Sequence, residues 1–232
     1  MRALIEKIGP DLMGTQEGVF PQLKELASDL PRYSWLGLGR DGGSRGEFMA
    51  IFYRTLRFEV LEYDHFWLSD TPQVIASTSW GNTNRRMVTW IRFRDRQTGR
   101  DFYFFNTHLD HAIEAARQKA AALIRERIDG LKRDLPVLLV GDFNARGNDS
   151  RSYEILTAES FLEDAWLRAA ARRSESFDTF HNYTPPRQTG FRIDWILSRG
   201  PWIIDAAEVL TFSLNGQYPS DHFPVAAWVR LK

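Results

Sequence analysis

The stretch VLLVGDFN, residues 137–144, contains the pattern that decides the fold. Its four leading apolar residues predict a short strand buried on both faces, as occurs inside a layered α/β protein. Asp142 and Asn144 follow where this strand ends. Because side chains alternate along an extended chain, we expect both to point to one side, with the buried run holding them rigidly. The stretch therefore predicts an inner strand whose end carries functional side chains.

The segments before this strand form a predicted crossover unit. Strand-like runs at 87–95 and 100–109 are joined by the turn sequence RQTG, and a helix follows at 112–132. A strand, a long helix and then a buried strand is the order of a crossover connection.

The rest of the chain adds further strands and helices. Helices are expected at 2–8, 20–30, 150–158 and 163–172, and strands at 11–18, 33–39, 47–54, 56–68, 191–198, 202–212 and 223–231. No internal repeat or linker interrupts this series. We therefore expect one domain over residues 1–232 of the α/β (α+β) class, a two-layer β-sandwich of mixed sheets flanked by helices.

Composition narrows the class of protein. Hydrophobic residues make up 43% of the chain and charged residues 26%, which is typical of a folded globular domain. Thirty basic and thirty acidic residues balance, which argues against a protein that holds nucleic acid mainly by long-range charge. The basic stretch at 85–100 is either a track for a nucleic-acid backbone or the solvated face of a hairpin, and we favour the hairpin. No cysteine is present, so a disulfide, a thiolate metal site and a thiol nucleophile are excluded.

The chain also contains no apolar stretch of the roughly 20 residues that a membrane span needs, and MRALIEKIGP has no apolar signal-peptide core. We expect a soluble monomer without stable membrane association. The cellular location stays open, because a targeting segment would lie upstream of this start.

Polar residues collect at five predicted strand ends, in the motifs TQE (Glu17), NTHLDH (Asn106, His108), GDFN (Asp142, Asn144), RIDW (Asp194) and SDHFPV (Asp221, His222). Each residue alone has an ordinary structural explanation, such as helix capping or turn formation. Together, hard oxygen ligands without cysteine favour Mg²⁺ or Mn²⁺. Two histidines and two amides suit a phosphoryl group, whose charge hydrogen-bond donors stabilise.

In this order and spacing, the five motifs resemble those of the endonuclease/exonuclease/phosphatase superfamily, near its deadenylase-like branch, over about residues 5–231. The resemblance implies a four-layered deoxyribonuclease-like sandwich. It also implies a Mg²⁺-dependent phosphoesterase that hydrolyses a phosphodiester or phosphomonoester by in-line attack of water. A catalytically impaired binding module with the same fold is the alternative.

The resemblance assigns roles to the residues around the metal and the water. Glu17 binds the divalent ion, and Asp221 contacts it directly or through water. Asp142 orients or deprotonates the attacking water, and Asn144 donates its amide to a phosphate oxygen.

Two histidines lie beside the phosphorus in such proteins. His222 matches the first, with Asp194 fixing its tautomer, and His108 matches the second, with Glu47 as its partner carboxylate. Whether His222 acts as a base or as an electrostatic stabiliser stays open.

Further residues are expected at the substrate. Arg86 resembles a phosphate-contacting arginine, and Asn106 shares a face with His108 and is expected to reach the substrate. Candidates for a substrate wall are Trp67, Phe180, His181 and Tyr183. We rank nucleic acid or nucleotide first as the substrate, phosphorylated sugar second and phospholipid third.

The start of the chain departs from the family pattern. Family members begin with a core strand carrying an asparagine that helps hold the metal, and only sixteen residues precede Glu17 here. We expect this strand to be missing and the domain to be short at its N-terminus. A protein that starts at Met1 would then bind metal weakly and turn over slowly.

Overall fold

The buried run of residues forms β7 (Val137–Asp142), an inner strand of a six-stranded sheet in the computed structural model, which describes residues 1–132 and 134–232. The sheet has the order β4-β5-β6-β7-β10-β8. Its other strands are β4 (Phe58–Trp67), β5 (Met87–Asp95), β6 (Asp101–His108), β8 (Glu163–Asp164) and β10 (Asp194–Arg199). The crossover predicted from the sequence is present: β6 runs parallel to β7, and α3 (Glu114–Asp129) connects them.

A second layer of strands packs against this sheet. It consists of two three-stranded sheets with the orders β1-β3-β2 and β12-β11-β9. The first contains β1 (Leu12–Val19), β2 (Tyr33–Leu36) and β3 (Glu47–Arg54), and the second contains β9 (Ala171–Arg172), β11 (Trp202–Val209) and β12 (Val225–Leu231). Apolar side chains from both layers, among them Ile51, Ile91 and Phe104, meet between them and are buried.

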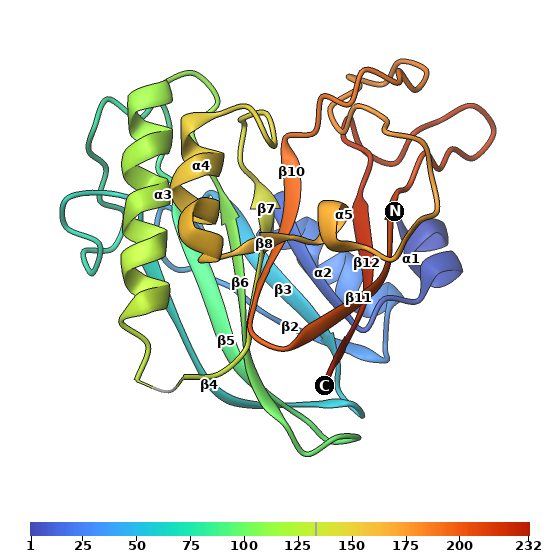
Figure 1. The fold of residues 1–232 in the computed structure, drawn as a ribbon, viewed down its shortest axis with the longest axis horizontal. Coiled ribbons are helices and arrows are strands. Elements are labelled where there is room, and N and C mark those ends of the chain that lie inside the picture. Colours follow the sequence, from blue (N-terminus) through green and yellow to red (C-terminus); the bar gives the residue numbers. More distant parts are fainter. Residues whose placement is uncertain (133) are drawn as a thin grey trace.

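Helices cover the outer faces of the two layers (Figure 1). On one side lie α3 and α4 (Arg151–Thr157), the latter followed by the short 3₁₀ helix η1 (Ala158–Ser160). On the other side lie α1 (Arg2–Ile8) and α2 (Phe20–Asp29). The small helix α5 (Ala165–Arg168) packs Trp166 against β11. The predicted fold class, a two-layer β-sandwich of mixed sheets between helices, is confirmed.

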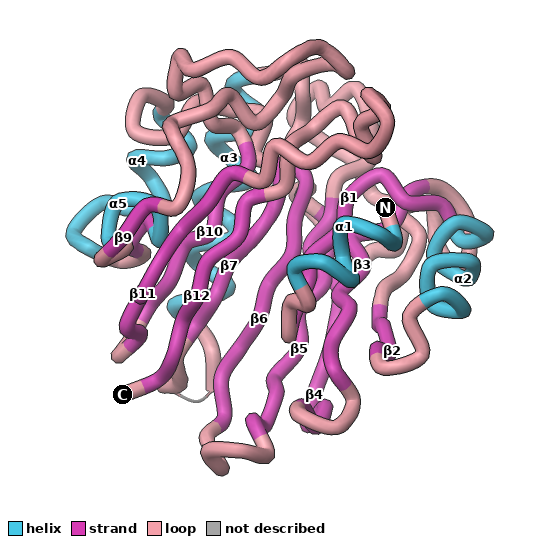
Figure 2. The backbone as a smooth tube through the Cα atoms, turned by 90° about the vertical axis from the view of Figure 1, so that its right-hand side faces the viewer, coloured by secondary structure: helices cyan, strands magenta, loops and turns pink. Residues whose placement is uncertain are grey.

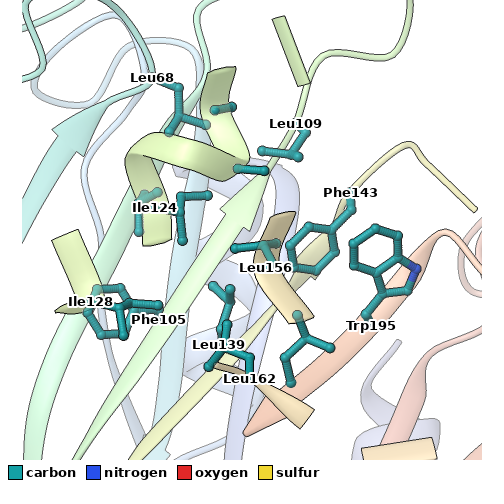
Figure 3. Close-up of a cluster of buried hydrophobic side chains, with 14 of the residues drawn as sticks. Leu68, Phe105, Leu109, Ile124, Ile128, Leu139, Phe143, Leu156, Leu162 and Trp195 are labelled. Atoms are coloured by element: carbon teal, nitrogen blue, oxygen red, sulfur yellow. The ribbon is translucent and has the colours of Figure 1, made fainter. Parts of the chain in front are cut away.

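The largest core cluster lies between the six-stranded sheet and helices α3 and α4, and Figure 3 shows part of it. The rings of Phe143 and Trp195 stack face to face, with centroids 4.2 Å apart and an interplanar angle of 10°. Burying side chains of this size contributes roughly 1.5–3 kcal/mol each. The cluster therefore anchors the ends of β7 and the start of β10, which are the segments that carry Asp142 and Asp194.

The close approach of β6 to β7 explains why the GDFN motif has a glycine, Gly141. A Cβ atom at this position would lie 2.2 Å from the carbonyl oxygen of Thr107 on β6. Only a residue without a side chain lets the two strands approach this closely.

One predicted element is wrong. The helix expected at 163–172 is instead divided between β8, α5 and β9. Asp164 is held by the buried guanidinium of Arg192, and β8 pairs with β10, so tertiary contacts override the helical propensity of this alanine-rich segment.

The missing first strand stays a prediction. Within the described residues, β1 and β12 each pair with a strand along one edge only. In that same part of the chain, every helix is too short or too polar to span a membrane.

Candidate active site

Residues from all five predicted motifs meet in one cleft at the ends of β6 and β7 and the start of β10. Figure 2 shows loops gathered above these strand ends, away from the β5–β6 hairpin. The cleft has a volume of about 460 Å³. The residues that line it are Glu17, Arg40, Glu47, Asn84, Arg86, His108, His111, Asp142, Asn144, Phe180, Ile193, Asp221 and His222.

The register of the strands brings His108 and Asp142 together, because they are paired residues of the parallel strands β6 and β7. The chain then turns instead of continuing as a strand. Asn144 has a φ of 47° and donates its backbone N–H to Asp142 Oδ1 at 2.8 Å. Asp142 and Asn144 thus lie on one side as predicted, but a turn places them there and not strand alternation.

The amide of Asn144 connects three groups of the cleft. Its Nδ2 lies 3.0 Å from His108 Nε2, 3.1 Å from the carbonyl oxygen of Leu109 and 3.2 Å from Asp142 Oδ2. An amide has two N–H groups for these three acceptors. A phosphate oxygen that accepts from Asn144 therefore replaces one of the existing contacts.

His222 and Asp194 form a hydrogen-bonded pair. His222 Nδ1 lies 2.9 Å from Asp194 Oδ2, so Nε2 is left to face the cleft. Burial lowers the pKa of His222, but the hydrogen bond and charge of Asp194, with Asp142 and Asp221, raise it overall to about 9. The imidazole is therefore positively charged at neutral pH.

The other titrating groups of the cleft have shifted pKa values as well. Burial, reinforced by the charge of Asp194, raises the pKa of Asp142 to about 7. Burial, with the charges of Arg86 and His222, holds the pKa of His108 well below its usual range, so this ring is neutral. The cleft thus combines a charged imidazole, a neutral imidazole and a carboxylate that titrates near neutral pH.

Arg86 is a buried cation with unused donors. Its side chain is 4% exposed, and its Nε and Nη1 atoms have no hydrogen-bond partner within the described residues. Nη2 donates to His111 Nδ1 at 3.3 Å. Burial, together with the charge of Arg40, lowers its pKa. A buried guanidinium with free N–H groups beside a cleft is suited to an anionic ligand.

Two carboxylates lie beside His108 in the cleft. Glu17, Glu47 and His108 each place one ligand atom within 4.8 Å of the others. Burial raises the pKa of Glu47 against the charge of Arg40, and the charge of Glu17 raises it further. A divalent cation would relieve this repulsion, and an oxygen-rich donor set fits Mg²⁺ or Mn²⁺. Asp221, the other predicted metal ligand, lines the same cleft.

The expected pairing of His108 with Glu47 is not formed. Glu47 instead makes an ion pair with Arg40 at 2.6 Å, and the ring of His108 contacts Asn144 and Asp142. Within the described residues, His108 Nδ1 has no hydrogen-bond partner, although Glu47 places a carboxylate oxygen within 4.8 Å of the ring.

Asn106 lies deeper than predicted. It is fully buried between the sheets, where Nδ2 donates to the carbonyl oxygens of Thr15 and Ala50 and Oδ1 accepts from Gln16. It does share a face with His108, but it lies two residues further into the strand. Asn106 therefore joins the two layers and does not line the cleft.

Two of the four candidates for a substrate wall are also structural. Trp67 is buried and donates to the carbonyl oxygen of Arg40, and His181 is buried against Phe223. Phe180 and Tyr183 are 39% and 60% exposed, and Phe180 lines the cleft. Of these candidates, Phe180 is placed to contact a substrate.

Sequence reasoning missed Arg40, Asn84 and His111, which also line the cleft. The available signal was Asp110, next to His111 within NTHLDH. Asp110 accepts hydrogen bonds from Thr83, Ala112 and Ile113. Burial opposes the charge of Asp110, but these hydrogen bonds lower its pKa to about 2. It thereby ties the 83–86 loop to the start of α3.

Comparison with known proteins gives a consistent match. The model of the Endonuclease/Exonuclease/phosphatase family matches residues 1–222. A solved mannosyl-6-phosphatase of Bacteroides thetaiotaomicron is 35% identical, with 99% of this chain and 89% of that chain covered and a TM-score of 0.93. A solved endonuclease/exonuclease/phosphatase of Bacteroides vulgatus is 32% identical, with 100% and 88% covered and a TM-score of 0.92.

A curated relative is more distant. An uncharacterised protein of Acanthamoeba polyphaga mimivirus is 29% identical over 167 residues, which is 68% of this chain. The matched region spans 61% of the length of that relative.

Proposed function

The chain belongs to the Endonuclease/Exonuclease/phosphatase family, a family of phosphoester hydrolases, and we propose that it removes a phosphate group from a small phosphorylated polyol such as a sugar phosphate. The observation that carries the proposal is the cleft itself. It places the guanidinium of Arg86, whose Nε and Nη1 are unpartnered within the described residues, the His222–Asp194 pair and Asp142 around one space. A phosphoryl group needs cationic donors on its oxygens and a base for the attacking water.

Each residue has a chemical task in this proposal. Arg86 binds the phosphate through Nε and Nη1, which have no hydrogen-bond partner in the part of the chain that the structure describes. Asp142 holds the attacking water and accepts its proton, since its pKa of about 7 suits a base near neutral pH. His222, charged and held through Nδ1, donates from Nε2 to an oxygen that gains charge as the ester bond breaks.

Glu17, Glu47 and Asp221 are the residues that would hold a divalent cation, Mg²⁺ or Mn²⁺. When bound, such an ion supplies positive charge that stabilises the phosphoryl oxygens. The side chains of Glu17 and Glu47 each place a carboxylate oxygen within 4.8 Å of the other, which is an arrangement that a cation stabilises.

The size of the cleft and the comparison support a small substrate. A volume of about 460 Å³ lies within the usual range for small-molecule sites, roughly 300–1,000 Å³. The relative with 35% identity over nearly the whole chain is a sugar phosphatase. We therefore place phosphorylated sugar ahead of nucleic acid or nucleotide, which reverses the order predicted from the sequence.

A nucleotide is the second candidate, and one observation favours it. Phe180 and Phe191 are partly exposed aromatic residues that lie on neighbouring segments, because Thr179 donates its N–H to the carbonyl oxygen of Phe191. Arg146 lies over the ring of Phe191 at 6.0 Å. Exposed aromatic rings of this kind suit the stacking of a base.

The test is phosphate release from mannose 6-phosphate, a nucleoside 5′-monophosphate, single-stranded DNA and a nitrophenyl phosphodiester, with Mn²⁺, Mg²⁺ or a chelator. We expect the sugar phosphate to give the highest kcat/KM and the chelator to abolish release. His222→Asn is expected to lower kcat at least about 100-fold. His65→Asn is the matched control, because His65 is a partly buried histidine of β4 bonded to Thr89. Release equal to wild type in the His222 variant would refute the assignment, and binding without release by any substrate would favour the impaired binding module.

A further inference from the structure

The two members of the His222–Asp194 pair belong to different layers of the fold. Asp194 is the first residue of β10, in the six-stranded sheet, and His222 precedes β12, in the other layer. Strand ladders therefore do not set the distance between them. Some other part of the chain has to hold the two segments in register.

Thr179 contacts both segments. It is fully buried, and its Oγ1 accepts hydrogen bonds from the backbone N–H of Ile193 at 2.9 Å and of Asp194 at 3.2 Å. Its carbonyl oxygen accepts from the backbone N–H of Phe223, the residue after His222, at 2.7 Å. One threonine thus fixes the backbone on both sides of the catalytic pair.

His181 contacts the residues on both sides of His222. Its ring stacks on Phe223, with centroids 3.6 Å apart and an interplanar angle of 3°, and its backbone N–H donates to the carbonyl oxygen of Asp221 at 2.9 Å. Its ring nitrogens lie 2.9 Å and 3.1 Å from the carbonyl oxygens of Thr184 and Ser220. A carbonyl oxygen only accepts, so each nitrogen that carries a proton has an acceptor within reach.

The residues beside Thr179 complete the connection. Phe180 forms a backbone bridge with His222, and the two rings lie 5.1 Å apart. Asp178, also buried, accepts hydrogen bonds from Thr189 and from the backbone of Phe191. The segment 178–184 therefore runs between the two halves of the pair and contacts both.

We propose that Thr179 is a positioning residue, whose hydroxyl and carbonyl groups set the distance between Asp194 and His222, and that segment 178–184 acts as a clamp on this pair. The inference rests on the proposed hydrolysis of a phosphate ester, because it assigns the clamp a part in that reaction. A misplacement of the pair weakens interactions made in the transition state, whereas Arg86, the proposed phosphate-binding residue, is on the separate loop before β5. The clamp therefore affects kcat and leaves KM nearly unchanged.

The experiment compares Thr179→Val with Thr179→Ser. Valine keeps the shape and removes the acceptor for two N–H groups, and serine keeps the hydroxyl. We expect Thr179→Val to lower kcat by about 10- to 100-fold with KM within about threefold of wild type. Thr179→Ser is expected to keep kcat within about threefold. Thr89→Val is the control, because Thr89 is equally buried and its hydroxyl is bonded to His65 on β4, so this variant loses stability and keeps kcat.

Amide hydrogen exchange gives a second measurement that does not depend on activity. In metal-free Thr179→Val, the amides of Ile193 and Asp194 are expected to exchange faster than in wild type and in Thr89→Val. If Thr179→Val does not fold, His181→Phe tests the same clamp, since phenylalanine keeps the stacking and removes the ring nitrogens that face the carbonyl oxygens of Thr184 and Ser220. We expect it to lower kcat by about 3- to 10-fold with little change in KM.

The outcomes separate this inference from the proposed function. A wild-type protein that releases no phosphate overturns the proposed function, and the exchange data then test the contacts alone. A wild-type protein that does turn over, together with a normal kcat in Thr179→Val, overturns the clamp. An equal loss of kcat in Thr89→Val also overturns it, because the effect would then follow from stability in general.

Discussion

Replacing Asp194 by Asn should remove most of the pH dependence of stability above neutral pH. The carboxylate of Asp194 accepts a hydrogen bond from His222 and is the main group that raises the pKa of that histidine to about 9 against burial. The folded-state pKa lies above the ordinary value of 6.5. The contribution to stability is therefore complete below about pH 6.5 and is lost as the pH rises through about 9.

The magnitude follows from the same two values. A rise in pKa from 6.5 to about 9 corresponds to about 3 kcal/mol of stability. Between pH 7.5 and pH 9.5 the wild-type protein should lose about 2 kcal/mol of this amount. Asp142, with its pKa of about 7, also destabilises the fold as it ionises. The comparison begins at pH 7.5 because the ionisation of Asp142 is largely complete at that pH.

The assay is urea unfolding of the metal-free protein at these two pH values. We expect the free energy of unfolding of Asp194→Asn to fall by less than about 0.5 kcal/mol over the range. Asp205→Asn is the control: Asp205 pairs with Arg230 on the surface, and this variant should keep the wild-type dependence. An NMR titration should place the midpoint of His222 in Asp194→Asn well below its midpoint in wild type, because the hydrogen bond and charge that raise the pKa are lost. The prediction is wrong if the free energy of unfolding falls as much in Asp194→Asn as in wild type between pH 7.5 and pH 9.5.

Three further changes test other parts of the structure. Arg86→Met should weaken inhibition by inorganic phosphate at least about 30-fold. Its free energy of unfolding should stay unchanged or rise, because the substitution removes a buried charge with two N–H donors unpartnered within the described residues. A large loss of stability would contradict this. Asp164→Asn should cost about 3–5 kcal/mol in urea unfolding, because it leaves the guanidinium of Arg192 buried without its partner at 2.9 Å; a cost below about 1 kcal/mol would show that the pair is not buried as described. Gly141→Ala should cost more than about 3 kcal/mol, since its Cβ would meet the backbone of β6, whereas Gly130→Ala, with its nearest neighbour at 3.3 Å, should cost far less in the same assay.

Much of the fold could be predicted because buried strands and helices require apolar residues at characteristic spacings. The apolar run at 137–140 and the helical spacing before it are consequences of the layers on either side of β7 and of the packing of α3. The segment at 163–172 has no such signal. Its conformation depends on the contact of Asp164 with Arg192, which lies 28 residues away.

The site could be predicted where its residues end a strand. Asp142, His108 and Asp194 are fixed by strand register, so their meeting follows once the strand order is known. Asn106 was misplaced because alternation gives the face of a strand and not the depth along it. Arg40 and His111 were missed because loops carry them, and the position of a loop depends on distant contacts such as those of Asp110.

The direction of a single strand decides whether this chemistry is possible. Within the described residues, β6 and β7 are the one parallel pair of the six-stranded sheet, and its other pairings are antiparallel. If β7 ran the other way, its aspartate would lie at the far end of a six-residue strand, roughly 20 Å from the imidazole of His108. Helix α3 therefore does more than cover the core. It returns the chain to the end of the sheet at which β6 began, so that β7 runs parallel to β6 and Asp142 lies beside His108. A direct hairpin between β6 and β7 would separate these two residues.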